Sequence, residues 1–283
     1  MSKRCDKRLK PNQKIMTKYK HILFLVLLLT GLLGFSACDK QETANLKIMS
    51  YNIRHGEGLD GVLDLSRAAA IIKAQAPDLC GLQEIDHYCS RTDSVGQTAL
   101  LAQQTNMEGT FGKFMNYQGG EYGMATLSAK PLISTKVLSL PDGIHEPRSS
   151  IVHEVEIAKD CNIVFVNVHF DWINGADGIS SRLNQAKTLV KYVDTMDKAI
   201  IITGDFNCTP DSPTMQYFYE QGFEFATKGE DKLSFQGDNK GEIDHVIFRS
   251  TTSQKIKVTS IALLDEPVVS DHRPLLTELT VIY

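Results

Sequence analysis

Short apolar runs of strand length recur along the chain from residue 46 to residue 281, and most of them stop at a polar or charged residue. The clearest one extends from Ala199 to Gly204 and is followed by Asp205. Runs of this length, with alternating or continuous apolar residues, predict β-strands. We expect strands at residues 46–53, 78–84, 123–128, 133–140, 150–157, 162–169, 199–205, 243–248, 255–263 and 275–281. Two hairpins are predicted, at residues 123–140 and 150–169.

Four segments between these runs carry helical patterns. Residues 64–76 place apolar side chains on one face and are ended by Pro77, and the other three segments are 97–106, 179–193 and 211–222. Strands outnumber helices in both halves of the chain, and no change in composition marks a second domain. Two sheets packed face to face, with the helices outside, bury such elements best. The sequence therefore predicts an α/β fold, a four-layer sandwich, in a single domain of residues 46–283.

The N-terminal segment differs from the rest of the chain. Residues 1–20 are basic, residues 22–35 form an almost unbroken apolar run, and Ser36-Ala37-Cys38 follows. This pattern is typical of a secretory signal, and the cysteine resembles the acylated residue of a bacterial lipoprotein lipobox. We therefore expect residues 1–37 to be a signal peptide, Cys38 to be lipidated, and residues 38–45 to be a tether. A coincidental cysteine, an uncleaved anchor helix and a start at Met16 stay open.

The charge of the predicted mature chain bears on its partners. Residues 1–37 hold eight of the 30 Lys and Arg residues and one of the 34 acidic residues, which leaves a net charge of −11. An acidic surface repels polyanions, so nonspecific binding of nucleic acid is disfavoured. Four cysteines of the domain lack metal-binding spacing, and their pairing stays open; these are Cys80, Cys89, Cys161 and Cys208.

Acid, amide and imidazole side chains lie at or just past the ends of the predicted strands. They are Asn52, Glu84, His169, Asp205, Asn207, Asp244, Asp271 and His272. Such groups can hold a hard divalent cation through oxygen and move protons around a phosphate. Taken singly, each also has a structural interpretation: Glu84 as a solvent-facing strand end, Asn52 as a turn residue, Asp205 and Asn207 as an Asx-turn, and His169 as a scaffold residue.

Asp244 and His272 suggest a more specific arrangement. A carboxylate can hold the ring of a catalytic imidazole in one tautomer, and Asp244 could do so for His272. Asp271 and His272 are adjacent and face different ways, which suits a metal ligand beside a substrate contact. Arg148, ahead of a predicted strand, is a candidate clamp for a substrate phosphate, with an exposed surface arginine as the alternative.

In this order the motifs resemble those of the endonuclease/exonuclease/phosphatase superfamily, which includes DNase I-like nucleases, sphingomyelinases and inositol phosphatases. The matching blocks are Ser-Tyr-Asn52, Leu-Gln-Glu84, Asn-Val-His169, Gly-Asp205-Phe-Asn207, Ile-Asp244-His and Ser-Asp271-His272. The resemblance spans residues 46–283 and implies two packed, mainly antiparallel sheets with the site at one edge. It also implies Mg²⁺, or Mn²⁺, bound by Glu84 with Asn52 and Asp271.

The resemblance further implies hydrolysis of a phosphodiester or phosphomonoester by in-line attack of water. His272, paired with Asp244, and Asp205 are candidates for activating the water, and the division between them stays open. His169 and Asn207 would stabilise the transition state.

The substrate is less well defined than the reaction. The acidic charge and the lipidation motif favour a small or lipid-linked phosphoester, handled by a monomer at the bacterial cell envelope. A secreted nuclease and a non-catalytic binding module of the same fold are the alternatives. We expect the loops 56–61, 116–122 and 172–179 to form the rim of the pocket.

Overall fold

The computed structural model describes residues 41–283. The predicted signal peptide, Cys38 and the first residues of the predicted tether, up to residue 40, lie outside this range. The tether also ends earlier than expected, because Thr43 already pairs with Ile282 in a sheet. Within residues 41–283, no helix combines the length and the apolar character needed to cross a bilayer.

The first of the two sheets has its strands in the order β11-β12-β1-β2-β4-β3. The strands are β1 (Thr43–Asn52), β2 (Leu79–His87), β3 (Glu108–Tyr117), β4 (Gly120–Ser128), β11 (Lys255–Leu263) and β12 (Leu275–Ile282). Only β1 and β2 run parallel to each other, and the remaining neighbours in this sheet are antiparallel.

The second sheet repeats this plan in the order β5-β6-β7-β8-β10-β9. Its strands are β5 (Leu132–Ser139), β6 (Ser149–Ala158), β7 (Cys161–His169), β8 (Ile200–Asp205), β9 (Glu224–Phe225) and β10 (Asp244–Arg249). Here β7 and β8 form the parallel pair, and the other neighbours are antiparallel. Each sheet therefore contains one parallel pair beside antiparallel strands, as expected for mainly antiparallel sheets.

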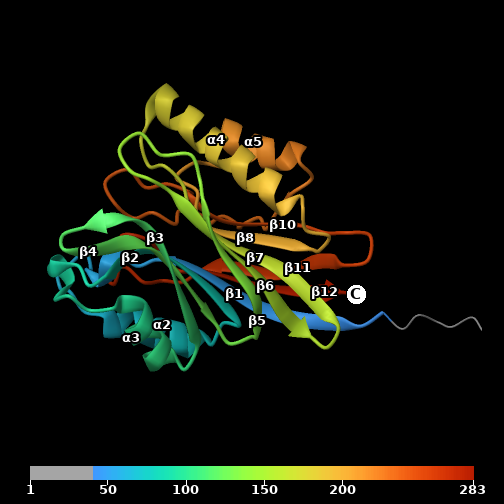
Figure 1. Ribbon diagram of the computed structural model, residues 1–283, viewed down its shortest axis with the longest axis horizontal. Coiled ribbons are helices and arrows are strands. Elements are labelled where there is room, and N and C mark those ends of the chain that lie inside the picture. Colours follow the sequence, from blue (N-terminus) through green and yellow to red (C-terminus); the bar gives the residue numbers. More distant parts are fainter. Residues whose placement is uncertain (1–40) are drawn as a thin grey trace, which may run out of the picture. The chain divides into compact units, whose positions relative to one another are not determined.

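Helices cover the outer face of each sheet (Figure 1). The helices are α2 (Leu65–Gln75), α3 (Gln97–Thr105), α4 (Gly175–Val193) and α5 (Pro213–Glu220), with 3-10 turns η1 (Arg54–Gly56) and η2 (Ser90–Thr92). In Figure 1, α4 and α5 lie above the sheet that contains β7, β8 and β10, and α2 and α3 lie below the other sheet. The predicted four-layer α/β sandwich is confirmed.

The alternation of side chains along β8 shows how the layers are held together. Ile201 faces the apolar layer between the sheets, whereas Ile200 and Ile202 face the layer under α4 and α5. Successive side chains of a strand point to opposite faces, so a continuous apolar run suits a strand that is buried on both sides. The run of three isoleucines at the start of β8 follows from this position.

The prediction of a hairpin at residues 123–140 was wrong. Residues 123–128 and 133–140 do not form a hairpin, because β4 pairs with β2 and β3 in the first sheet while β5 pairs with β6 in the second. The chain therefore crosses between the sheets at Lys130-Pro131. Strand β3 was not predicted, and α4 begins at Gly175, four residues before the predicted start. The hairpin of β6 and β7 is confirmed.

The two parallel pairs determine where the site forms. Helix α2 connects β1 to β2, and α4 connects β7 to β8. The C-terminal residues of β1 and β8 lie in contact, since Nδ2 of Asn52 donates a hydrogen bond to Asp205. The ends of both parallel pairs therefore meet at one end of the sandwich.

Candidate active site

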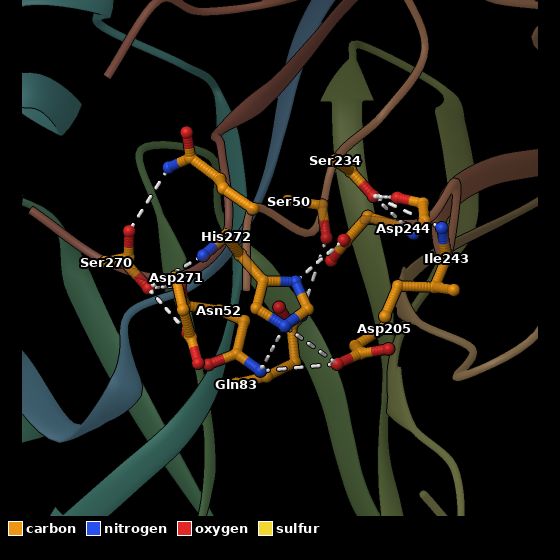
Figure 2. A network of polar contacts seen from close by, with 12 residues as sticks. Ser50, Asn52, Gln83, Asp205, Ser234, Ile243, Asp244, Ser270, Asp271 and His272 are labelled. Atoms are coloured by element: carbon orange, nitrogen blue, oxygen red, sulfur yellow. Dashed lines mark hydrogen bonds and ion pairs between the residues drawn. The ribbon is translucent and has the colours of Figure 1, made fainter. Parts of the chain in front are cut away.

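The carboxylate of Asp205 lies where three predicted site residues converge. Figure 2 shows Asn52 and His272 directed toward it. Its Oδ2 accepts a hydrogen bond of 3.2 Å from Nδ2 of Asn52. The same oxygen lies 3.6 Å from Nε2 of His169 and 3.6 Å from Nε2 of His272. Asn52, His169 and Asp205 are the last residues of β1, β7 and β8. Residues that are distant in the sequence thus share one buried carboxylate.

His272 is oriented by a second buried carboxylate. Its Nδ1 donates a hydrogen bond of 2.8 Å to Oδ2 of Asp244, the first residue of β10. This bond leaves Nε2 directed toward Asp205, as Figure 2 shows. Ser234 fixes the start of β10, because its Oγ accepts the backbone N–H groups of Ile243 and Asp244. The predicted pairing of Asp244 with His272 is present.

The charges of this cluster follow from burial and proximity. Burial disfavours protonation of His272, but the carboxylates of Asp244 and Asp205 outweigh it and raise the pKa of His272 to about 10. The imidazolium in turn lowers the pKa of Asp244 below its usual value, although burial acts in the opposite direction. Burial raises the pKa of Asp205. The resting cluster is therefore an imidazolium paired with Asp244, next to a carboxyl group that can hold or release a proton.

His169 has the opposite character. Burial, together with the positive charge of Arg148 and then of His272, holds the pKa of His169 well below its usual value. Its imidazole is therefore neutral, and Nδ1 has no hydrogen-bond partner among the described residues. A neutral imidazole beside Asp205 can donate one hydrogen bond without adding a positive charge.

Glu84 occupies a β-bulge of β2. Pairing with β4 skips Glu84 between Gln83 and Ile85, and the backbone of Glu84 has φ of 57°. A non-glycine residue in the left-handed region is strained, and such strain is found where a structure must aim a side chain. The bulge places Glu84 in the lining of the cavity together with Asp271. Burial and then the charge of Asp271 raise the pKa of Glu84.

Both ends of the Asn52 amide have hydrogen-bond partners. Its Nδ2 donates to Oε1 of Glu84 at 3.0 Å, whereas its Oδ1 accepts the backbone N–H of Arg54. Asn52 therefore acts here as a donor that orients Glu84, and Oδ1 keeps a second lone pair, so its predicted role as an oxygen ligand stays a prediction. Asp271 has a positively charged neighbour, since Oδ2 lies 3.7 Å from Nε of Arg54.

A second set of candidate ligand atoms lies in the same region, formed by Asp205, Asp244 and His272. The hydrogen bond between Asp244 and Nδ1 of His272 already uses the facing atoms of two of these residues. Glu84 and Asp271 lack such a bond to each other, and the charge of Asp271 raises the pKa of Glu84. The pair Glu84 and Asp271 therefore suits a cation better, because a divalent ion would relieve the repulsion.

Asn207 and Arg148 flank this centre. Asn207 forms the Asx-turn, in which its N–H donates to Oδ1 of Asp205, and Nδ2 donates to the backbone oxygen of Phe170. One amide hydrogen of Asn207 stays available for a phosphoryl oxygen. Arg148 is only 3% exposed and donates to Oε2 of Glu146 at 2.6 Å, so the alternative of an exposed surface arginine is wrong.

A cavity of about 480 Å³ opens over these groups. Its lining includes every predicted catalytic and substrate-binding residue except Asp244, which lies behind His272. Of the three predicted rim loops, residues 116–122 contribute Tyr122 and residues 172–179 contribute Trp172 and Asn174, whereas residues 56–61 contribute none. The four cysteines of the domain are buried free thiols.

Sequence reasoning missed several residues that shape the site. The segment from Phe235 to Ile243 lines the cavity, and the Phe235 ring lies 5.0 Å from the ring of His272. Ser270 links two parts of the centre, because its Oγ donates to the backbone oxygen of Asn52 and accepts the N–H of His272. Only the position of Ser270 beside Asp271 gave a signal in the sequence; the segment around Phe235 has no strand or helix pattern.

Comparison with known proteins agrees with this geometry. A family model described as "Endonuclease/Exonuclease/phosphatase family" matches residues 49–272. No curated protein matches the chain significantly by sequence.

Several solved structures share the fold. An endonuclease/exonuclease/phosphatase from Beutenbergia cavernae has a TM-score of 0.71 at 20% identity, covering 83% of this chain and 71% of its own. A family protein from Bacteroides vulgatus has a TM-score of 0.66 at 20% identity, and the match covers 83% of this chain and 98% of that protein. The catalytic domain of human Nocturnin, with a bound sulfate anion, has a TM-score of 0.66 at 18% identity. This match covers 87% of this chain and 98% of the Nocturnin domain. The chain belongs to the endonuclease/exonuclease/phosphatase family, whose members hydrolyse phosphoester bonds.

Proposed function

We propose that this protein is a metal-dependent phosphoester hydrolase that acts on a small or lipid-linked phosphoester by in-line attack of water. The observation that carries the proposal is the convergence of Asn52, His169 and His272 on Asp205, beside the carboxylates of Glu84 and Asp271. Family membership supports phosphoester hydrolysis in general, and the donor set supports a divalent cation.

Glu84 and Asp271 would hold the metal, with Mg²⁺ as the expected ion and Mn²⁺ as a substitute. Hard cations of this kind prefer carboxylate oxygens and keep several waters. Asn52 would keep Glu84 in position through its 3.0 Å hydrogen bond. When bound, the cation would neutralise charge on the phosphoryl group and on the leaving oxygen.

The side chains of the chain itself supply the proton transfers and hydrogen bonds. Asp205 lies within 3.6 Å of Nε2 of both His169 and His272, so it can accept the proton of an attacking water held among them. His272, kept cationic by Asp244, stabilises negative charge on the phosphoryl oxygens. His169 donates a hydrogen bond as a neutral imidazole. These preformed donors act most strongly in the transition state, when charge develops.

The proposed substrate class rests on charge and location. The predicted mature chain has a net charge of −11 and offers no basic track for a polyanion. A lipid at Cys38 would hold the enzyme, as a monomer, at the bacterial envelope. Replacing Cys38 by alanine should abolish incorporation of labelled fatty acid and release the protein from membranes. Retention of both in the variant would contradict the lipoprotein assignment.

Activity on a panel of phosphoesters tests the proposed function. The full chain would be assayed with Mg²⁺ or Mn²⁺ on bis-p-nitrophenyl phosphate, p-nitrophenyl phosphate, sphingomyelin, inositol phosphates and plasmid DNA, with His272→Ala as the inactive control. Turnover of small or lipid esters that His272→Ala lacks would support the proposal. Turnover of DNA alone would indicate a nuclease, and no turnover at all would indicate a binding module.

A further inference from the structure

Trp172 has an unusual position for a large apolar side chain. It is the only tryptophan of the chain, its side chain is 51% exposed, and it lies in the lining of the catalytic cavity. It follows His169 by three residues, in the loop that connects β7 to α4. An indole combines a wide flat face with little conformational freedom, which suits it for contacts with a ligand.

Buried polar side chains hold the backbone on both sides of Trp172. Nη1 of Arg182, on α4, donates hydrogen bonds of 2.8 Å to the backbone oxygens of both Asp171 and Ile173. Oε1 of Gln185, one turn further along α4, accepts the N–H of Asp171 at 3.0 Å. Arg182 is 5% exposed and Gln185 is fully buried. The two residues next to Trp172 are therefore fixed to the helix.

Arg182 and Gln185 thus form a clamp on this loop, and the carboxylate of Asp171 extends the clamp to a second loop. Oδ1 of Asp171 accepts the N–H of Ile173, and Oδ2 accepts the N–H of Ile144 at 2.9 Å. Ile144 precedes His145, whose ring lies 6.4 Å from the ring of Trp172. The packing is also close, because a Cβ added to Gly178 would lie 1.7 Å from the backbone oxygen of Ile173. Only glycine permits α4 to approach the loop this closely.

The proposed reaction gives no role to this clamp. Asp171, Arg182 and Gln185 are buried and polar, yet none of them lines the cavity. What they do is fix the loop that carries an exposed indole at the cavity wall. Fixing a contact residue before binding lowers the entropic cost of binding, which is the general benefit of preorganisation.

We propose that Trp172 is a specificity-determining residue that stacks on a planar heterocycle of the substrate, so that the preferred substrate is a small nucleotide-like phosphoester. This inference rests on the proposed function. The cavity of about 480 Å³ can accept a phosphate together with a nucleoside-sized group. Asn174 and Asn239 lie in the same lining and can bond the heteroatoms of a ring edge, which an acyl chain lacks.

Intrinsic fluorescence offers a direct test, because all tryptophan emission comes from Trp172. The full chain, freed of metal with a chelator so that no turnover occurs, would be titrated with adenosine 5′-monophosphate and with ribose 5-phosphate. Excitation at the red edge of the indole band avoids absorption by adenine. We expect saturable quenching by the nucleotide and none by the sugar phosphate.

Two outcomes of this titration would overturn the inference. One is an equal response, or no response, to both compounds. The other is an emission shift with phosphatidylcholine vesicles and none with the nucleotide, which would make Trp172 a contact for lipid. Since no hydrolysis is measured, the result stands whether or not the proposed activity is found.

Kinetics with matched esters provide a second test. Trp172→Ala should lower kcat/KM for adenosine 5′-monophosphate about tenfold, mainly through KM, and leave ribose 5-phosphate unchanged, as expected for the loss of one stacking contact. Trp172→Phe should retain most of the preference of the wild type for adenosine 5′-monophosphate over ribose 5-phosphate. Arg182→Met, which frees the loop, should cause the same selective loss as a positioning defect. Ile179→Ala, an exposed residue outside the cavity lining, is the control.

An equal loss on both esters, or no loss on either, would contradict the role of Trp172. If the wild-type protein hydrolyses neither ester, the hydrolase proposal fails for these compounds, and the fluorescence titration still decides whether Trp172 binds a ring.

Discussion

Asp244 and His272 form a buried pair in which Nδ1 of the imidazole lies 2.8 Å from a carboxylate oxygen. Asp244→Asn would present a neutral amide to the same nitrogen and remove the charge that keeps the imidazole of His272 protonated and in place. We expect kcat to fall on the order of 10⁴-fold with little change in the melting temperature, as a lost orienting carboxylate does in other imidazole-dependent sites. Asp160→Asn, in the exposed turn between β6 and β7, is the control. A fall below tenfold would show that Asp244 does not orient His272.

Glu84 should determine metal binding. Saturating Mg²⁺ should raise the melting temperature of the wild-type chain by about 5–10 °C, since a ligand at 100 times its Kd stabilises by about 2.7 kcal/mol. Glu84→Gln should lose this gain. Without metal, the variant should be at least as stable as the wild type, because burial and the charge of Asp271 disfavour the charged carboxylate. Glu224→Gln should respond like the wild type, and a full shift in Glu84→Gln would place the metal elsewhere.

Asn167 should stabilise the packing of the two sheets. It is fully buried, donates to the backbone oxygens of Leu82 and Ala125, and accepts a hydrogen bond of 2.7 Å from Gln83. Asn167→Ala should lower the free energy of unfolding in urea by about 3 kcal/mol, because buried polar groups lose their partners.

Asn162→Ala is the matched control, since it removes a partly buried hydrogen bond to Glu154. It should cost less than about 1 kcal/mol. An equal loss of unfolding free energy in the two variants would show that the hydrogen bonds of Asn167 between the sheets stabilise the protein no more than a bond near the surface does.

His153 should make the protein sensitive to acid. Burial lowers the pKa of His153 from its usual 6.5 to about 4. Between these values the unfolded chain binds a proton that the folded chain does not. The contribution of His153 to the free energy of unfolding is therefore fully present above pH 6.5. It is lost as the pH falls toward 4, and the loss amounts to about 3 kcal/mol at most. Urea unfolding at a series of pH values should show a smaller decline in His153→Gln than in the wild type. Parallel declines would show that His153 titrates normally.

The predictable parts of the fold were those in which local pattern and buried position agree. Strand β8 is apolar because it is buried on both faces, and its last residue, Asp205, emerges at the site. Strand β3 was missed because glycines and Lys113 interrupt its apolar residues, and it pairs only with β4. The error at Lys130-Pro131 arose because proximity in the sequence does not determine which sheet a strand joins.

The site was predictable in its residue types and less so in its geometry. Carboxylates and imidazoles at strand ends were visible in the sequence, whereas the left-handed backbone of Glu84 was not, since nothing marks a non-glycine residue for that conformation. The contact of Phe235 with His272 also depends on tertiary structure, because an isolated bridge joins these residues across 37 positions of the chain.

The meeting of two parallel pairs has a consequence for how the protein loses activity. Asn52 and Glu84 come from one sheet, His169 and Asp205 come from the other, and neither set forms a centre alone. A partly denatured state in which each sheet persists but the sheets have separated would keep its circular dichroism and lose catalysis. Enzymatic activity should therefore report the docking of the two halves, and it should vanish before the secondary structure does.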